Sequence, residues 1–212
     1  MGLITFKKGH IGANLSAHNS FKSFIIFVFM LLMTTSGAMA EVIDGLNYDL
    51  NSETKTATLL PKQDGKYSGD IVVPEKVKRN NGVEYVVTSL GNYCFSYCEG
   101  LTSITIPSSV TSLGNYCFRD CEGLTSITIP SSVTSLGRSC FYSCRGLTSI
   151  TIPSSVTSLG RGCFSYCEGL TSITIPSSVT SLGRGCFYSC RGLTSITIPS
   201  SVTSLGNYCF NG

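Results

Sequence analysis

The sequence contains no tryptophan and only two histidines, His10 and His18, both within the first 40 residues. The rest of the chain has no imidazole, the side chain most often used as a general base, which excludes histidine-dependent catalysis there. Charged residues are also scarce, at 13% of the chain. Residues 1–40 hold three of the 15 basic residues and none of the 12 acidic ones, so residues 41–212 are neutral overall. A neutral surface argues against binding nucleic acid or anionic lipid.

The main apolar run is short. It covers residues 24–33, follows Lys7, Lys8 and Lys22, and precedes a stretch of small residues that ends in Ala38-Met39-Ala40. A membrane-spanning helix needs about 20 apolar residues. A basic segment, a short apolar core and an A-x-A ending are typical of a secretory signal peptide. We therefore predict a signal peptide at residues 1–40, cleavage before Glu41, and a secreted or surface-located bacterial protein without membrane insertion after cleavage; an uncleaved anchor is the alternative.

The remaining sequence is dominated by a 23-residue repeat. The unit runs from Leu101 to Gly123 and restarts at Leu124, Leu147, Leu170 and Leu193. A fixed period in the twenties predicts a solenoid, in which each unit buries its apolar face against its neighbours. We assign residues 41–66 to a small β-rich N-terminal cap containing a hairpin of residues 43–50 and 56–60. Residues 67–212 form the solenoid, which stops in the middle of a repeat, and we expect a longer natural chain.

The pattern within one repeat predicts an α/β repeat solenoid. Leu101, Ile104 and Ile106 alternate with polar residues and predict a strand whose apolar side chains face inward. Residues 71–74 align with residues 104–107 and predict a degenerate first repeat. Residues 117–124 carry apolar side chains at helical spacing, which predicts a short helical turn on the convex side. Gly123 is expected to end that turn in a left-handed conformation.

The order L-x-x-I-x-I-P-x-S-V-x-x-L-G-x-x-C-F-x-x-C-x-G resembles the BspA-like leucine-rich repeat of bacterial surface proteins. The resemblance is strong over residues 86–212 and weak over residues 67–85. It implies a leucine-rich repeat fold and adhesion to host extracellular-matrix proteins or to surface proteins of other bacteria. Ser109 stands where this repeat has asparagine, and Cys117 stands where it more often has alanine.

The eleven cysteines form two columns with C-x3-C spacing in each repeat. The first interpretation is two rows of buried, reduced thiols that pack as small apolar groups. The alternatives are disulfides, which export favours, and zinc bound by pairs from adjacent repeats. We predict reduced thiols, with no metal site and no cofactor. A serine in place of Cys144 is then expected to lack a sure hydrogen-bond partner.

Two surfaces are candidate binding sites. The first is a pair of hydroxyl rows on the outer strand face, which we expect to be concave: Ser103, Thr105, Ser126, Thr128, Ser149, Thr151, Ser172, Thr174, Ser195 and Thr197. The second is a convex stripe of tyrosine and arginine, two residue types enriched at binding hot spots: Tyr116, Arg138, Tyr142 and Arg145.

The sequence thus predicts a binding protein and not an enzyme. The carboxylates of the repeats are scattered and no phosphate-binding glycine loop is present. Adhesion through repeated solenoid faces is the main hypothesis. A structural spacer that presents a missing C-terminal domain is the first alternative. Ice binding by the hydroxyl rows is the second, and we expect curvature of the repeat sheet to disfavour it.

Overall fold

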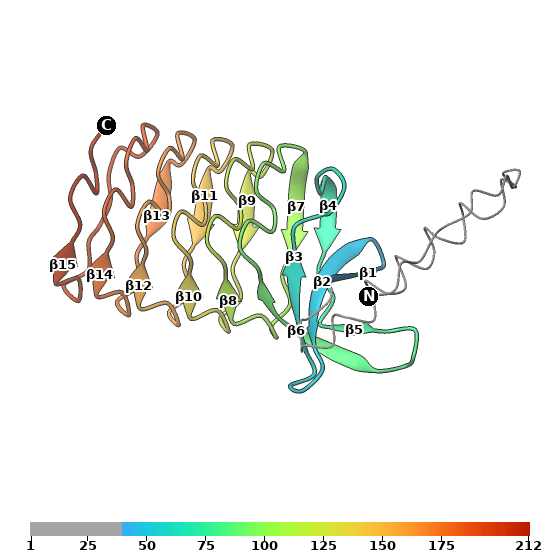
Figure 1. The fold of residues 1–212 in the computed structure, drawn as a ribbon. Helices are drawn as coiled ribbons and strands as arrows, with labels where there is room; N and C mark the ends of the chain where they lie inside the picture. Colours follow the sequence, from blue (N-terminus) through green and yellow to red (C-terminus); the bar gives the residue numbers. More distant parts are fainter. Residues whose placement is uncertain (1–39) are drawn as a thin grey trace, which may run out of the picture. The chain divides into compact units, whose positions relative to one another are not determined.

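Strands of successive repeats lie side by side along one axis (Figure 1). The computed structural model describes residues 40–212. The predicted signal peptide, apart from Ala40, lies outside the described residues. Within residues 40–212, no helix is long and apolar enough to cross a membrane.

The N-terminal strands form an antiparallel meander that joins the repeats. β1 (Ala40–Ile43), β2 (Leu46–Asn51) and β3 (Thr56–Leu60) pair in sequence order. The predicted hairpin is therefore confirmed, with Tyr48 opposite Leu59. β3 then pairs in parallel with β6 (Glu84–Leu90), and β5 (Lys76–Lys78) folds back on β6. The meander continues the sheet of the repeats, so the first rung has no free edge on that side.

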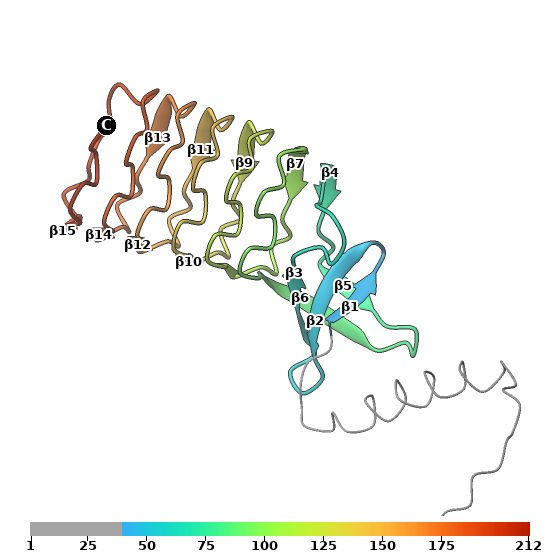
Figure 2. The same cartoon turned by 45° about the horizontal axis from the view of Figure 1, so that its top comes forward.

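The repeats are held together by two parallel ladders on different sides of the stack (Figure 2). The first is interrupted: β4 (Gly69–Val72) pairs with β7 (Leu101–Thr105), and β9 (Ser126–Thr128), β11 (Ser149–Thr151) and β13 (Ser172–Thr174) form a separate three-stranded sheet, with no strand pairing between β7 and β9. The second runs from β6 through β8 (Ser112–Leu113), β10 (Ser135–Leu136), β12 (Ser158–Leu159), β14 (Ser181–Leu182) and β15 (Ser204–Leu205).

The register of the first ladder follows the sequence repeat. Ile150 lies opposite Ile127 and Ile173, each 23 positions away. The alignment of the degenerate repeat is confirmed, because Ile71 lies opposite Ile104. The second ladder was not predicted from the sequence: Ser112 and Leu113 pair with the same positions of the next repeat.

The expected helical turn was wrong, and the described residues contain no helix. Residues 115–124 form consecutive turns. Some of their N–H groups donate to carbonyl groups of the same repeat, and the N–H groups between them donate to carbonyl groups of the next repeat. The Arg119 N–H donates to the Tyr116 carbonyl at 3.2 Å, whereas the Phe118 N–H donates to the Cys140 carbonyl at 2.8 Å. Tyr116 and Asp120 have φ values of 56° and 55°, which a right-handed helix does not allow. The repeat is therefore all-β with turns, not α/β.

The role expected for Gly123 was also wrong. Gly123 is not among the residues with positive φ. A Cβ atom at this position would lie 2.5 Å from the Glu99 carbonyl oxygen of the preceding repeat. The glycine thus permits close stacking of two turns and does not serve as a left-handed helix cap.

A single file of phenylalanines fills the core. Phe95, Phe118, Phe141, Phe164 and Phe187 stack with ring centroids 5.2–5.5 Å apart and interplanar angles of 1–6°. The first four are fully buried. Because neighbouring rings are nearly parallel, each repeat is tilted only slightly from the one before it.

A serine ladder lies beside this core, at the position where the resembling repeats have asparagine. The Ser132 hydroxyl donates to the Val110 carbonyl of the preceding repeat at 2.6 Å, and Ser178 and Ser201 make the equivalent bond at 2.7 and 2.9 Å. Ser109, which follows the degenerate repeat, has a buried hydroxyl without a partner among the described residues. Serine hydroxyl groups therefore link successive repeats by hydrogen bonds at the position that asparagine occupies in the resembling repeats.

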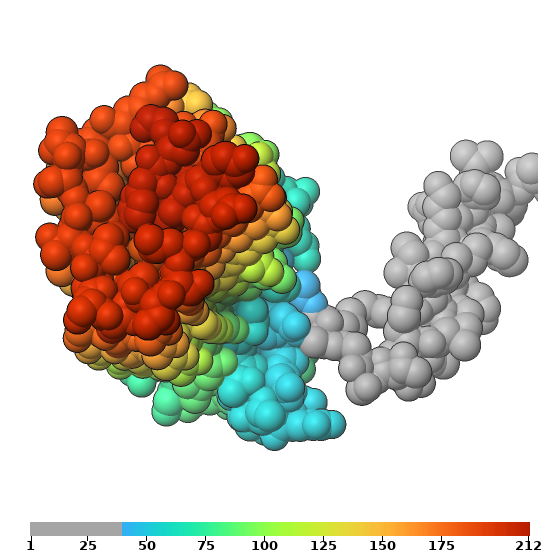
Figure 3. Space-filling view, turned by 90° about the vertical axis from the view of Figure 1, so that its left-hand side faces the viewer, coloured from blue at the N-terminus to red at the C-terminus, as the bar shows by residue number. Residues whose placement is uncertain are grey.

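The C-terminal rung is the most exposed one. Figure 3 looks onto this rung, with the earlier ones behind it along the axis. Leu205 and Phe210 are 55% and 42% exposed, whereas their counterparts Leu182 and Phe187 in the preceding repeat are buried.

Candidate functional site

The cysteine columns are buried and unbridged. All eleven thiols are free and lie in the core. In the second column the Cys121 thiol donates to the Phe95 carbonyl at 3.0 Å, and Cys144 donates to the Phe118 carbonyl at 2.9 Å. The expectation that a hydroxyl at position 144 would lack a partner was therefore wrong, because this carbonyl would accept its proton.

Burial also makes these thiols poor nucleophiles. Desolvation raises the pKa of Cys117, Cys140, Cys144 and Cys163 well above the usual value, since a thiolate is costly in an apolar interior. A thiol reacts as the thiolate, so the core positions are chemically quiet at neutral pH. The cysteines act as packing and hydrogen-bonding groups.

The predicted hydroxyl rows lie where the alternation placed them. Ser103, Thr105 and their equivalents in the next four repeats are exposed, and we call this surface the Ser/Thr face. In β9, β11 and β13 the rows are in register: Ser149 lies opposite Ser126 and Ser172, and Thr151 lies opposite Thr128 and Thr174. The rows of Ser195 and Thr197 continue beyond β13 in residues without strand pairing.

An aspartate ends the Ser/Thr face at its N-terminal side. Asp70 on β4 accepts hydrogen bonds from Thr102 Oγ1 at 2.8 Å and Ser103 Oγ at 2.6 Å. These two bonds stabilise the carboxylate, and they lower the pKa of Asp70. Ser103 is thus already engaged, whereas the rungs at Ser126, Ser149 and Ser172 present the open part of the face.

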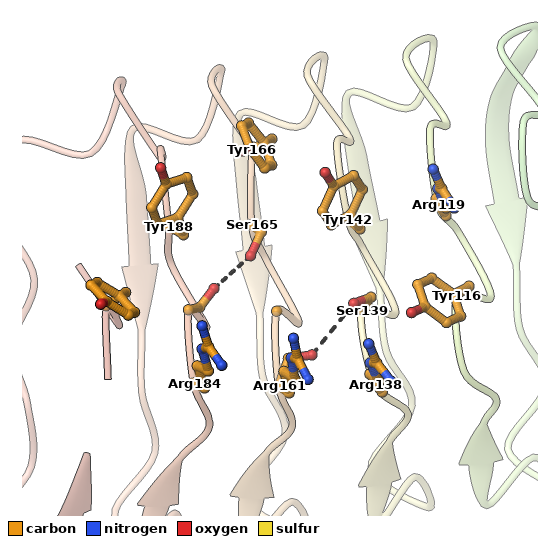
Figure 4. A pocket seen from close by; sticks show the side chains of 13 residues that line it. Tyr116, Arg119, Arg138, Ser139, Tyr142, Arg161, Ser165, Tyr166, Arg184 and Tyr188 are labelled. Atoms are coloured by element: carbon orange, nitrogen blue, oxygen red, sulfur yellow. Dashed lines mark hydrogen bonds between the residues drawn. The ribbon is translucent and has the colours of Figure 1, made fainter. Parts of the chain in front are cut away.

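A hollow of about 470 Å³ lies on the other candidate surface, over the turns of five repeats. One side is a row of guanidinium groups from Arg138, Arg161 and Arg184 (Figure 4). The opposite side is a row formed by Arg119 and the tyrosines 142, 166 and 188. Tyr116, Arg138 and Tyr142, three of the four residues of the predicted convex stripe, lie together in this hollow. Arg145 lies outside the hollow and faces Glu122, with Nη1 and Oε1 3.7 Å apart.

The hollow exists because one column of side chains is shortened in the middle repeats. Positions 93, 116 and 208 of this column carry tyrosine, whereas the positions between carry Ser139, Gly162 and Gly185. Every member has a positive φ of 52–62°, so the backbone course is the same throughout. Replacing a phenol ring by a hydroxymethyl group or a hydrogen atom leaves an open trough that ends at Tyr116 and Tyr208.

Small hydroxyl groups line the floor of the trough. Ser139 Oγ lies 3.5 Å from the Arg161 carbonyl, and Ser165 Oγ donates to the Gly185 carbonyl. Arg161, Arg184 and Ser165 were not among the predicted site residues. The two arginines have a signal in the sequence, because arginine recurs at 138, 161 and 184 while the neighbouring column loses its tyrosine.

Cations also hold the tyrosines at the ends of the hollow. The Arg138 guanidinium lies 5.7 Å from the Tyr116 ring centroid, and Arg184 lies 5.5 Å from that of Tyr208. Arg119 lies over the Tyr142 ring at 5.3 Å and pairs with Asp120 at 2.9 Å. The walls are therefore ordered by contacts within the protein before any ligand is bound.

The comparisons with known proteins identify related repeats. The profile of the BspA type leucine rich repeat region matches residues 88–212 in six copies. A leucine-rich cell surface protein from Faecalibacterium prausnitzii is 31% identical, with a TM-score of 0.62, and the alignment covers 81% of this chain and 52% of that one. A leucine-rich repeat protein from T. pallidum has a TM-score of 0.65 at 23% identity, over 79% of this chain and 86% of that one.

A leucine-rich repeat protein from Eubacterium ventriosum is 24% identical with a TM-score of 0.58, over 85% of this chain and 50% of that one. The chain thus spans about half the length of two of these three structures. No curated protein matches the chain significantly.

Proposed function

The chain belongs to the BspA-type leucine-rich repeat family, and we propose that it is an exported surface protein that binds other proteins through the Ser/Thr face. The family model and the cell-surface relative support a surface protein of the protein-interaction type. Adhesion to host matrix proteins or to surface proteins of other bacteria is the specific proposal.

The observation that carries the proposal is the register of the open rungs. Ser126, Ser149 and Ser172 lie opposite one another, as do the corresponding threonines, so one small hydrogen-bonding site is copied along the stack. Copies on one stiff scaffold engage a partner with a high effective concentration, and total affinity rises steeply with the number of copies. Binding of this kind depends on repeat number and not on one residue.

Within residues 40–212, the lack of an accessible thiol and of histidine supports binding over catalysis. The core thiols are buried with raised pKa values, and residues 40–212 contain no histidine. The proposal needs no cofactor and no metal ion.

The first experiment removes repeats without disturbing the register. Deleting residues 124–169 removes two whole repeats and joins Gly123 to Leu170, which restores the native junction sequence. We expect attachment to immobilised fibronectin or to whole partner bacteria to fall by much more than the single change Thr151→Ala causes. Circular dichroism controls for folding. Unchanged attachment after the deletion, or no saturable binding by the intact chain, would favour the structural spacer.

A second experiment tests which face binds. Lysine at Thr128, Thr151 and Thr174 blocks the open rows of the Ser/Thr face. The matched control places lysine at Thr134, Thr157 and Thr180, which are equally exposed but adjoin the second ladder. We expect loss of binding only in the first triple variant, and equal loss in both would refute the assignment to this face.

Ice binding is a second candidate, because the tilt between successive repeats is small, whereas the sequence led us to expect a curved sheet. The interplanar angles of 1–6° in the phenylalanine stack mean that adjacent hydroxyl rows are almost parallel. An ice plane requires such a regular array. Thermal hysteresis of the purified chain tests this function, and the lysine variant of the Ser/Thr face should abolish any hysteresis while the control variant retains it.

A further inference from the structure

The hollow over the turns is not used by the function proposed above. It lies on the turns and not on the Ser/Thr face. Its volume of about 470 Å³ falls within the range of small-molecule and oligomer sites. Its form comes from three consecutive repeats that lack the tyrosine of the flanking ones, with Gly162 at the centre.

The arginine row carries uncompensated positive charge. Within residues 40–212, no carboxylate lies within 4.0 Å of the guanidinium groups of Arg138, Arg161 or Arg184. No carboxylate is among the residues that line the hollow, and Asp120, which pairs with the lining residue Arg119, is already engaged. Guanidinium groups bind carboxylates in a planar, bidentate geometry, so three of them in a row favour a ligand with several carboxylates.

The spacing of the charges is set by the stack. Consecutive rungs of a parallel ladder lie about 4.8 Å apart, and the tyrosine rings opposite are 5.2 and 5.4 Å apart between centroids. The ligand must therefore repeat its charge once per rung along the solenoid axis. An extended peptide repeats its side chains on one face every ~6.6 Å, which is out of phase with the rungs.

The tyrosine row adds a second requirement. Tyr142, Tyr166 and Tyr188 are half-buried, with their rings tilted by 59° and 62° relative to the next one. Phenol rings offer an apolar face with a polar tip, a combination that packs against the C–H face of a sugar ring and bonds to its hydroxyl groups. A polymer of sugar rings meets this requirement better than a chain of acidic side chains.

We propose that the hollow binds an acidic polysaccharide whose successive sugars carry carboxylates, lying along the solenoid axis. A uronic acid chain has one carboxylate per ring, and a pyranose ring is about as long as one rung is thick. Arg138, Arg161 and Arg184 bind successive carboxylates, the tyrosine row packs against the rings, and Ser139 and Ser165 lie on the floor. Tyr116 and Tyr208 close the ends of the site.

The test uses oligogalacturonate of defined length with the purified chain and isothermal titration calorimetry. The fully methyl-esterified oligomer has the same sugars without charge, and poly-L-glutamate has the charge without sugars. We expect binding of the acid form alone, weakening as salt is added because the contacts are electrostatic. Binding of the ester with equal affinity, tighter binding of poly-L-glutamate, or no binding at all overturns the proposal.

Two variants locate the site. Arg161→Gln removes the central charge and should weaken binding about tenfold, the loss of one charge-assisted contact. Arg191→Gln is the matched control, because it removes the same charge from an exposed arginine outside the hollow, and it should leave the affinity unchanged. Equal losses in both variants would mean unspecific attraction and would overturn the proposal.

Ser139→Tyr should fill part of the hollow with a side chain that the native protein already accommodates at equivalent positions. The native chain already holds tyrosine at the same column in Tyr93 and Tyr116, whose rings stack at 5.0 Å with an interplanar angle of 6°. A tyrosine at position 139, where φ is 52°, should extend that stack. We expect an unchanged melting temperature and no oligogalacturonate binding. Full binding by a folded Ser139→Tyr variant refutes a site in the hollow. This outcome does not bear on protein binding, which rests on the Ser/Thr face.

Discussion

Alanine at two glycines of one column should have opposite effects on stability. Gly137 and Gly160 occupy equivalent positions in consecutive repeats, and neither has a positive φ. At Gly137 a Cβ atom would lie 2.5 Å from the Asn115 nitrogen of the preceding repeat. At Gly160 the nearest atoms would be 3.6 Å away, which is ordinary contact.

The expected magnitude follows from the hydrogen bonds at the junction. To reach ordinary contact of 3.4 Å, the rung at Gly137 must move about 0.9 Å, the difference between 3.4 and 2.5 Å. That movement would stretch the bond from the Gly137 N–H to the Leu113 carbonyl, now 2.8 Å, out of range, together with the bond from Thr134 to Thr111 at 3.0 Å. With overpacking added, Gly137→Ala should cost about 2–4 kcal/mol.

Gly160→Ala should be neutral or stabilising by up to about 1 kcal/mol, because alanine restricts the unfolded chain. The junction at Gly160 is looser in a second respect. Gly114, Gly137, Gly183 and Gly206 donate their N–H to the preceding repeat at 2.8 Å, and within the described residues Gly160 makes no such bond. Urea unfolding followed by circular dichroism under reducing conditions measures both variants. Equal stability of the two variants would refute close stacking as the reason for glycine in this column.

Three further predictions concern the thiols. All eleven cysteines should react with a thiol reagent in urea without prior reduction, and nearly none in the native state, because all are buried and unbridged. A single reactive thiol in urea would instead indicate five disulfides. Burial raises the pKa of ten thiols above 9.0, and that of Cys190 to about 12. The free energy of unfolding should therefore be at its full value below pH 9 and fall steeply as the pH rises above 9. A constant free energy of unfolding between pH 9 and 11 would contradict this prediction. The Cys144→Ser hydroxyl keeps a carbonyl acceptor, whereas the Cys140→Ser hydroxyl faces the Cys117 thiol. Cys140→Ser should therefore lower the free energy of unfolding in urea by about 1–2 kcal/mol more than Cys144→Ser. A larger loss of stability in Cys144→Ser would exclude the hydrogen bond to the Phe118 carbonyl.

The parts of the fold that depend on periodicity could be predicted from the sequence. Alternation placed Ser149 and Thr151 outside and Ile150 inside, and the aligned pair Ile71 and Ile104 lies in register. These features follow from which side chains are apolar, and the repeat fixes their order along the stack.

The turns could not be predicted in this way. Tyrosine at φ 56° is uncommon, and residue type gives no sign of it. Apolar spacing at Cys117 and Cys121 suits a helical turn equally well, and only the N–H bonds to the next repeat decide against it. The same turns create the hollow, so its second half, from Arg161 to Tyr188, was outside the candidate site named from sequence.

The alternating turn bonds have a mechanical consequence. At the junctions between the repeats of β9, β11 and β13, backbone hydrogen bonds run along three lines: the strands of the Ser/Thr face, the second ladder and the turns, where the Phe141 N–H donates to the Cys163 carbonyl at 2.9 Å. Tension along the axis loads these three lines at once, so a rung in this part of the stack cannot separate on one side first. Junctions under tension act in series, and lengthening the rod adds reach without changing the force that opens it. That force is set by the weakest junction. The candidates are the junctions between β7 and β9 and after β13, which lack strand pairing on the Ser/Thr face, and the junction between Leu136 and Gly160, which lacks the glycine N–H bond.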